Sequence, residues 1–191
     1  MHSSYLLASA ALLAACIGLP PEPVPEPNHA QQGVVVVDVD GTLTPRDSAF
    51  LEARDGAAQV LAVYRRKGYT VVYLSARVPL LQPGLPHWLQ QNGFPKGPLH
   101  VAQSASERAR PDQFKAEVLR SYVVRGWRLA YAYGDSSTDF AAYAAAGLRA
   151  EQVFAIRRHG DADCQPGVYA QCLDGWVGHL FAIERSEPKA R

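Results

Sequence analysis

Two aspartates, Asp38 and Asp40, have the residue type and spacing to carry out phosphoryl chemistry. They stand two positions apart in DVDGTLT, directly after the apolar run 33–37. Strand side chains alternate with a period of two, so both carboxylates start on one side, and Gly41 allows a sharp turn beneath them. One carboxylate can attack a phosphoryl group and the other can transfer a proton, with a divalent cation offsetting the negative charges. We assign attack to Asp38 and proton transfer to Asp40. An ordinary Asp-Gly turn after a strand is the alternative.

Further along the chain, a hydroxyl and an ammonium group could contact the same phosphoryl group. The run YTVVYL at 69–74 is β-branched and aromatic, reads as a strand, and ends at Ser75, Ala76 and Arg77. Ser75 could hydrogen-bond a phosphoryl oxygen, and a capping serine is the alternative. Lys115 lies near the start of a helix predicted over 111–125, where it could neutralise phosphoryl charge. A solvated surface lysine is the commoner fate of this residue type.

A third polar cluster, GDSSTD at 134–139, follows the predicted strand RLAYAY at 128–133. Asp135 and Asp139 are four residues apart, so a helix that begins near Ser137 turns both toward the strand end. There they can complete the oxygen shell of a cation. Helix N-capping by Ser136 or Ser137 is the alternative for this motif.

The elements that must position these residues alternate along the chain. Strands are predicted at 33–39, 69–74, 128–133 and 152–156, with helices at 56–67, 85–92, 111–125, 138–146 and 175–184. This pattern predicts an α/β fold, a Rossmann-like parallel sheet with helices on both faces, which binds ligands at the carboxyl ends of its strands. The intervals between the motifs leave little room for a large cap domain.

In this order the clusters resemble the four motifs of the haloacid dehalogenase (HAD) superfamily: DVDGT, Ser75, Lys115 and GDSSTD. Within that superfamily the chain most resembles the lipin-type phosphatidate phosphatase domain, also called LNS2. The stretches that carry this resemblance are DVDGTLT, YLSAR, HWLQQNGFPKGPL, FKAEVLR and TDFAAYAAAGL. The resemblance spans residues 33–158.

The resemblance implies a covalent mechanism and a role for each motif residue. Asp38 would form an aspartyl-phosphate, and Asp40 would protonate the leaving alcohol and then activate water. Ser75 and Lys115 would hold the phosphoryl oxygens. The other implied substrate-binding positions are Gly41, Thr42, Ala76 and Arg77. The implied Mg²⁺ ligands are Asp38, the backbone carbonyl of Asp40, and Asp135, with Asp139 in support.

Two positions bear on the reaction class. Lipin-type domains usually have Asn where this chain has Asp135, and the aspartate keeps an oxygen ligand while adding negative charge. Dehalogenases of the superfamily lack a proton donor at the position of Asp40. The presence of this acid therefore favours phosphoryl chemistry over carbon–halogen cleavage.

We therefore expect a Mg²⁺-dependent phosphatidate phosphatase that releases diacylglycerol and phosphate. A site without a large lid suits a head group presented by a bilayer, where Arg77 and Lys96 could contact lipid phosphate. One alternative is a broad-specificity exported phosphomonoesterase that acts on soluble esters. Another is a non-catalytic phosphatidate-binding module, although such a module has no need of both Asp38 and Asp40.

The amino terminus predicts export. Residues 1–15 contain no Asp, Glu, Lys or Arg, and are too short to span a bilayer, which takes about 20 residues. The run Leu13, Ala14, Ala15, Cys16 resembles a bacterial lipoprotein cleavage box, in which the cysteine becomes lipid-bearing. We expect a signal peptide at 1–15 and a periplasmic protein anchored to a bacterial membrane through acylated Cys16. An uncleaved hydrophobic anchor or plain secretion are the alternatives.

Residues 16–32 are rich in proline, which favours an extended form of about 3.1 Å per residue. We expect a tether that could hold the catalytic domain, residues 33–185, up to about 50 Å from its anchor. A disordered segment with no spacing role is the alternative. Residues 186–191 form a tail.

The two remaining cysteines, Cys164 and Cys172, make an even pair in a loop rich in Gly and Pro, and a disulfide there agrees with export. A zinc site with His159 or His179 lacks paired-cysteine spacing. The net charge is +1, and the basic residues are dispersed without interleaved aromatics, which gives no sign of a nucleic-acid surface.

Overall fold

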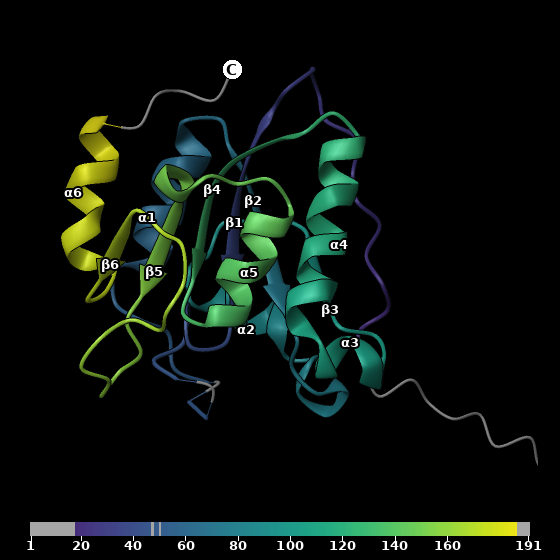
Figure 1. Ribbon diagram of the computed structural model, residues 1–191, viewed down its shortest axis with the longest axis horizontal. Coiled ribbons are helices and arrows are strands. Elements are labelled where there is room, and N and C mark those ends of the chain that lie inside the picture. The colour runs from purple at the N-terminus through teal and green to yellow at the C-terminus, as the bar shows by residue number, and fades with distance from the viewer. Residues whose placement is uncertain (1–17, 47, 50, 187–191) are drawn as a thin grey trace, which may run out of the picture.

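A computed structural model describes residues 18–46, 48–49 and 51–186, and the predicted signal peptide and the acylation site Cys16 lie outside this part. The described residues form a parallel sheet of six strands in the order β3-β2-β1-β4-β5-β6 (Figure 1). The strands are β1 (Gly33–Asp38), β2 (Thr70–Ser75), β3 (Leu99–Val101), β4 (Arg128–Gly134), β5 (Val153–Ile156) and β6 (Gln171–Leu173). This order confirms the predicted α/β fold.

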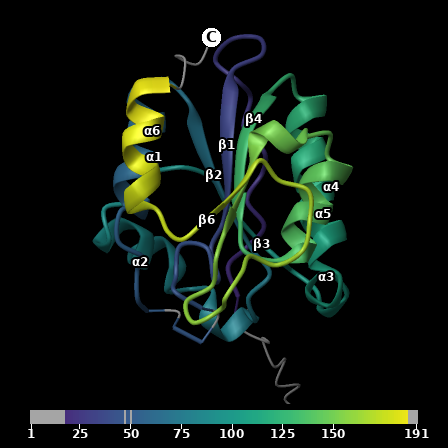
Figure 2. The same cartoon turned by 60° about the vertical axis from the view of Figure 1, so that its left-hand side comes forward.

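Helices cover both faces of the sheet, with α1, α2 and α6 on one side and α4 and α5 on the other (Figure 2). The helices are α1 (Ala57–Arg66), α2 (Leu85–Gln91), α3 (Ala105–Ala109), α4 (Pro111–Val124), α5 (Ser137–Ala145) and α6 (Val177–Ser186). Two 3₁₀ turns, η1 (Pro79–Leu81) and η2 (Ala150–Gln152), complete the list.

The central strand β1 shows why the sequence adopts this architecture. All six of its residues are buried, as expected for a parallel strand that is covered on both faces. Val35 and Val37 pack into the core beneath α1, while Val34 and Val36 pack into the core beneath α4 and α5. The period of two therefore divides one run of valines between two hydrophobic cores.

The sequence pattern missed β3, β6 and α3. The two strands have three residues each and lie at the two edges of the sheet, and α3 has five residues. Elements this short contain too few positions for a hydrophobic period to appear. They form because a longer neighbour supplies the pairing, as β2 does for β3 between Tyr73 and Leu99.

Residues 18–32 lie against the domain, so the prediction of a free tether is wrong for this part of the chain. The backbone N–H of Leu99 donates to Glu22 Oε2 (2.8 Å), and Trp127 Nε1 donates to the carbonyl of Pro25 (2.8 Å). An extended proline-rich segment has no internal hydrogen bonds, so its carbonyls are available to neighbouring donors. The tether prediction overlooked these partners because they lie far away in the sequence.

No second folded domain interrupts the described residues between β1 and α4, which hold only α1, β2, η1, α2, β3 and α3. Among all the described residues, no helix combines the length and the apolar composition needed to cross a bilayer. The carboxyl ends of the strands therefore lie beside loops and the ends of helices, with no inserted cap domain among the described residues.

Candidate active site

A cavity of about 350 Å³ lies at the carboxyl ends of β1, β2 and β4, at the lower edge of the sheet in Figure 1. This is the edge where open parallel sheets bind ligands. Among its lining residues are seven that the sequence singled out: Asp38, Asp40, Ala76, Arg77, Lys115, Asp135 and Asp139. We call this edge of the molecule the catalytic edge.

Three buried carboxylates and one buried ammonium form the centre of the site. Single carboxylate oxygens of Asp38, Asp135 and Asp139 all lie within 4.8 Å of one another. Lys115 Nζ donates to Asp38 Oδ1 (2.5 Å) and to Asp139 Oδ1 (2.6 Å). The helix α4 brings Lys115 to this position from its second turn, where the side chain is 5% exposed.

The charges in this centre are not balanced. Burial raises the pKa of Asp38 well above its usual value, the Asp139 carboxylate raises it further, and Lys115 opposes both effects. Burial and Asp139 also raise the pKa of Asp135 to about 6, against the lowering effect of Arg158. Burial alone would lower the pKa of Lys115, but Asp139 and Asp38 raise it above its usual range. Negative charge is therefore in excess.

The residues present fit a hard divalent cation. Asp38 Oδ2 is buried and has no hydrogen-bond partner among the described residues, which is costly for a carboxylate oxygen. Mg²⁺ prefers carboxylate and carbonyl oxygens as ligands. Asp38 Oδ2 and the Asp135 carboxylate are the oxygens placed to bind such an ion, and a ligand role for the Asp40 carbonyl stays a prediction.

Asp139 organises this centre through the oxygen that Lys115 does not use. Its Oδ2 accepts from the backbone N–H groups of Asp135 (3.2 Å) and Ser136 (3.1 Å) and from Ser136 Oγ (2.8 Å). Ser136 is the N-cap of α5, with Asp139 as its capping-box partner. The capping interpretation is therefore confirmed, and Asp139 holds the loop and Lys115 together, while its support of a bound cation stays a prediction.

Asp40 stands apart from the three clustered carboxylates. Its Oδ2 accepts from Ser75 Oγ (2.7 Å), and its Oδ1 forms an ion pair with the Arg77 guanidinium, including a bond from Nε (3.0 Å). The Asp40 side chain is 20% exposed toward the cavity. The two aspartates of DVDGT therefore have different surroundings, which suits one as a nucleophile and the other as a proton carrier.

Ser75 does not line the cavity, and its contact with a phosphoryl group stays a prediction. It is fully buried, and besides donating to Asp40 it accepts from the backbone N–H of Arg77 (3.2 Å). Its position at the end of a strand was predicted, but not the direction of its hydroxyl. In this structure Ser75 orients Asp40 and the turn that carries Arg77.

Gly41 and Thr42 also act on a carboxylate instead of lining the cavity. Gly41 has φ +87°, and a Cβ at this position would collide with the carboxylate of Asp135. Thr42 Oγ1 donates to Asp135 Oδ1 (3.1 Å). Both residues therefore position Asp135, and their predicted contact with substrate stays a prediction. Ala76 and Arg77 do line the cavity.

Two arginines at the site, Arg158 and Arg54, were missed by sequence reasoning. Arg158 pairs with Asp135 through Nε and lines the cavity. Arg54 binds the carbonyls of Gly41 (2.9 Å) and Arg157 (2.9 Å), which joins the loop after β1 to the segment after β5. Lys96 lies in the loop before β3 and does not line the cavity, and its contact with lipid phosphate stays a prediction. Of these two arginines, only Arg158 carried a sequence signal for a role in the site, because it lies just past the end of a strand.

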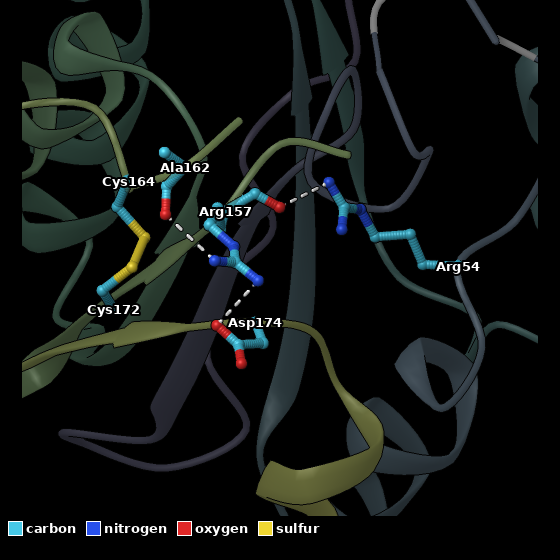
Figure 3. The surroundings of a disulfide bond; sticks show 6 residues. All are labelled: Arg54, Arg157, Ala162, Cys164, Cys172 and Asp174. Atoms are coloured by element: carbon cyan, nitrogen blue, oxygen red, sulfur yellow. Dashed lines mark hydrogen bonds and ion pairs between the residues drawn. A yellow bond between two sulfur atoms is a disulfide. The ribbon is translucent and has the colours of Figure 1, made fainter. Parts of the chain in front are cut away.

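The predicted disulfide between Cys164 and Cys172 is present, with the two Cα atoms 5.8 Å apart (Figure 3). It links the loop between β5 and β6, which begins at Arg157, to strand β6 itself. The Arg157 guanidinium binds the Ala162 carbonyl (3.0 Å) and Asp174 (3.1 Å), so both ends of this loop are fixed. The loop thereby supports the neighbouring Arg158.

Sequence comparison identifies the family. Residues 35–157 match the family model of the LNS2 domain of PITM 1-3. The chain belongs to the LNS2 family. Membrane-associated phosphatidylinositol transfer protein 1 of Homo sapiens is 31% identical over 157 residues, which are 78% of this chain and 12% of that protein. Protein retinal degeneration B of Drosophila melanogaster is 29% identical over 154 residues, with the same coverage of 78% and 12%. This LNS2 chain thus spans only a small part of these relatives.

Solved structures share the fold of this LNS2 chain. A putative HAD-like phosphatase from Mesorhizobium loti has a TM-score of 0.59 at 17% identity, over 90% of this chain and 93% of that one. D,D-heptose 1,7-bisphosphate phosphatase from Burkholderia thailandensis has a TM-score of 0.51 at 15% identity, over 81% and 100%. The chain is an LNS2 domain with the fold of HAD-superfamily phosphatases.

Mg²⁺ is expected to raise the Tm of the metal-free protein, and by more at about pH 7 than at about pH 5. The folded-state pKa of Asp135, about 6, lies above its usual 3.8, so its ionisation destabilises the fold as pH rises through this window. A bound cation removes that destabilisation only where the carboxylate is ionised. Thermal unfolding with and without Mg²⁺ measures this, and Asp135→Asn should flatten the pH dependence. An equal rise in Tm at both pH values would contradict the cation site.

Proposed function

We propose that this LNS2 protein is a Mg²⁺-dependent phosphatidate phosphatase that releases diacylglycerol and phosphate through an aspartyl-phosphate at Asp38. The observation that carries the proposal is the different placement of the two aspartates. Asp38 is buried against Lys115, and one of its oxygens has no hydrogen-bond partner among the described residues. Asp40 faces the cavity and is held by a hydrogen bond from Ser75 and an ion pair with Arg77.

In the first step, an oxygen of Asp38 attacks the phosphorus atom. The new bond joins the carboxylate to phosphorus, the ester P–O bond breaks, and Asp40 gives its proton to the departing alcohol oxygen. An entering phosphoryl group competes with Asp40 for the Arg77 guanidinium, because phosphate is a strong bidentate partner for arginine. This competition frees Asp40 to bind the leaving oxygen.

In the second step, Asp40 accepts a proton from a water molecule, whose oxygen attacks the phosphorus atom of the aspartyl-phosphate. The bond from Asp38 to phosphorus breaks, inorganic phosphate leaves, and both carboxylates return to their starting states. Lys115 stays beside Asp38 and offsets part of the charge in both steps. A divalent cation bound by Asp38 and Asp135 would neutralise the charge between nucleophile and phosphoryl group.

Two observations favour a lipid substrate over a soluble one. The cavity is bordered only by loops and by the ends of helices, so a head group at a bilayer surface can reach it directly. The name of the human relative refers to membrane association and to phosphatidylinositol transfer, which are properties of a lipid-handling protein. Arg77 and Arg158 are the cavity cations that would bind the phosphate of such a head group.

To test the substrate, the full chain with Mg²⁺ is offered phosphatidate in mixed micelles beside a soluble aryl phosphate. We expect kcat/KM to be at least about 10-fold higher for phosphatidate, since remote contacts with the lipid add to transition-state binding. Equal or better turnover of the aryl phosphate would favour a broad-specificity phosphomonoesterase. Binding to phosphatidate micelles with no phosphate release from either substrate would favour a non-catalytic binding module.

A further inference from the structure

The segment 18–32, which we call the strap, begins at the catalytic edge. Gln82 Oε1 accepts from the backbone N–H of Leu19 (3.1 Å), and Gln103 Nε2 donates to the Leu19 carbonyl (3.2 Å). Gln82 and Gln103 belong to the loops that follow β2 and β3. Gln82 Nε2 also donates to the carbonyl of Arg77 (2.9 Å). The Gln82 side chain therefore joins the start of the strap to a residue of the active site.

The strap then runs the length of the molecule to the opposite edge. Its middle is held by the contacts of Glu22 with Leu99 and of Pro25 with Trp127, and its end by the bond from Gln31 N to the Gly126 carbonyl (3.0 Å). In Figure 1 it is the purple segment that passes beside α4, from the end near α3 to the other end. Both ends and the middle are therefore fixed to the domain.

This course places Gly18, the first described residue, at the catalytic edge. Cys16 stands two residues before Gly18, and two residues span at most about 7 Å. Gly18 lies against Gln82 and Pro79, since a Cβ added to it would meet Gln82 Oε1 at 2.5 Å and Pro79 Cβ at 3.3 Å. Any membrane attachment made by residues 1–16 therefore starts beside the active site and not at the end of a spacer of about 50 Å.

The loops of the same edge expose large apolar side chains. Leu51 is 74% exposed, Val78 is 51% exposed and Leu80 is 74% exposed. Leu51 lies in the loop after β1, and the other two lie in the loop after β2, where Val78 lines the catalytic cavity. Exposed Arg110, directly before α4, adds a positive charge to this edge. Exposed apolar groups together with cations are the composition that binds an anionic bilayer interface.

We propose that the catalytic edge is a membrane-docking face for an anionic phospholipid bilayer. Residues 1–16 attach beside the active site, Leu51, Val78 and Leu80 enter the interface, and the cavity opens toward the lipid head groups. A free tether would let the site face any direction, whereas the strap fixes one. This inference deepens the proposed function and rests on it for the identity of the substrate, but docking itself requires no turnover.

The orientation is tested with two labelled variants of the full chain, each carrying Asp38→Asn so that lipid is not consumed. Leu80→Cys labels the catalytic edge, and Val124→Cys labels an 86% exposed position at the far end of α4. Each is labelled with an environment-sensitive fluorophore and mixed with vesicles of phosphatidate and phosphatidylcholine. The Asp38→Asn chain without an added cysteine measures any label taken up by Cys16.

We expect the label at position 80 to shift to the blue and to be quenched by a quencher in the bilayer, and the label at position 124 to do neither. An equal response at position 124 would overturn the proposal. So would an unquenched label at position 80 in protein that sediments with the vesicles, or a failure to sediment with them at all. None of these readouts depends on catalysis, so a failure of the proposed function is recognised separately, by the absence of phosphate release from the parent chain.

A matched pair of substitutions links docking to catalysis. Leu80→Asp is expected to lower turnover of phosphatidate in vesicles about 10-fold, because a charge replaces an interfacial apolar group. Its hydrolysis of a soluble aryl phosphate should be unchanged. Val124→Asp should change neither rate. Equal losses for the two variants, or an equal loss on both substrates, would contradict a docking role for Leu80.

Discussion

Replacing Asp38 by Asn is expected to lower turnover of any phosphomonoester by at least about 10⁴-fold, because the amide cannot form the aspartyl-phosphate. The fold should persist, since Asn has nearly the same size and Lys115 keeps its bond to Asp139 (2.6 Å). Phosphate release under saturating substrate measures the loss, and cooperative thermal unfolding shows that the variant is folded.

The matched control for this prediction is Asp161→Asn. Asp161 is an exposed aspartate in the loop between β5 and β6, and it does not line the cavity. Its substitution should leave turnover within about twofold of the parent, as is usual for exposed positions outside a site. Parent-level phosphate release by the Asp38 variant would show that another group is the nucleophile.

Replacing Lys115 by Met is expected to lower the free energy of unfolding by about 3–5 kcal/mol near neutral pH, because two buried carboxylates lose their cation. Lys115 Nζ is the ammonium that contacts both Asp38 (2.5 Å) and Asp139 (2.6 Å), and its side chain is 5% exposed. Turnover should fall as well, by at least about 10²-fold, since charge on the transferred group is no longer offset.

The pH dependence separates a charge effect from a packing effect in this variant. Lys115 lowers the raised pKa of Asp38, so without it the folded-state pKa of Asp38 rises further, and ionisation of this carboxyl destabilises the fold as pH increases through that pKa. At lower pH Asp38 is protonated and the deficit shrinks. Urea unfolding at about pH 5 and about pH 8 measures this, with exposed Lys96→Met as the control. An equal deficit at both pH values would mean that lost packing, not lost charge, destabilises the variant.

The local sequence was a good guide to the central fold. Val34, Val35, Val36 and Val37 form one buried strand because a continuous β-branched run suits a strand covered on both faces, and longer strands carry enough positions for this to be read. The edge strands β3 and β6 carry no such signal, since pairing with a longer neighbour creates them. The proline-rich strap was misread because its hydrogen-bond donors, such as Trp127 Nε1, lie about 100 residues away in the chain.

In the active site, too, the sequence located some features and only the folded structure decided others. Motif spacing located Asp38 and Asp40, and strand ends located Ser75 and Asp135. The hydroxyl groups that bind these carboxylates take their directions from residues far away in the chain. Thr42 turns toward Asp135, which is 93 residues away, and Ser75 turns toward Asp40, which is 35 residues away. Neither direction follows from residue type, because a hydroxyl can donate to substrate or to a carboxylate equally well.

The sequence by itself determined the paired aspartates, their place after a buried strand and the cysteine pair, because each depends on residues close together in the chain. Tertiary structure alone decided that Ser75 and Thr42 orient carboxylates, that Arg54 and Arg158 join the site, and that the strap begins at the catalytic edge. These features are contacts between segments that only the folded sheet brings together. Hydrophobic periodicity specifies which face of an element is buried, but not which distant side chain it meets there.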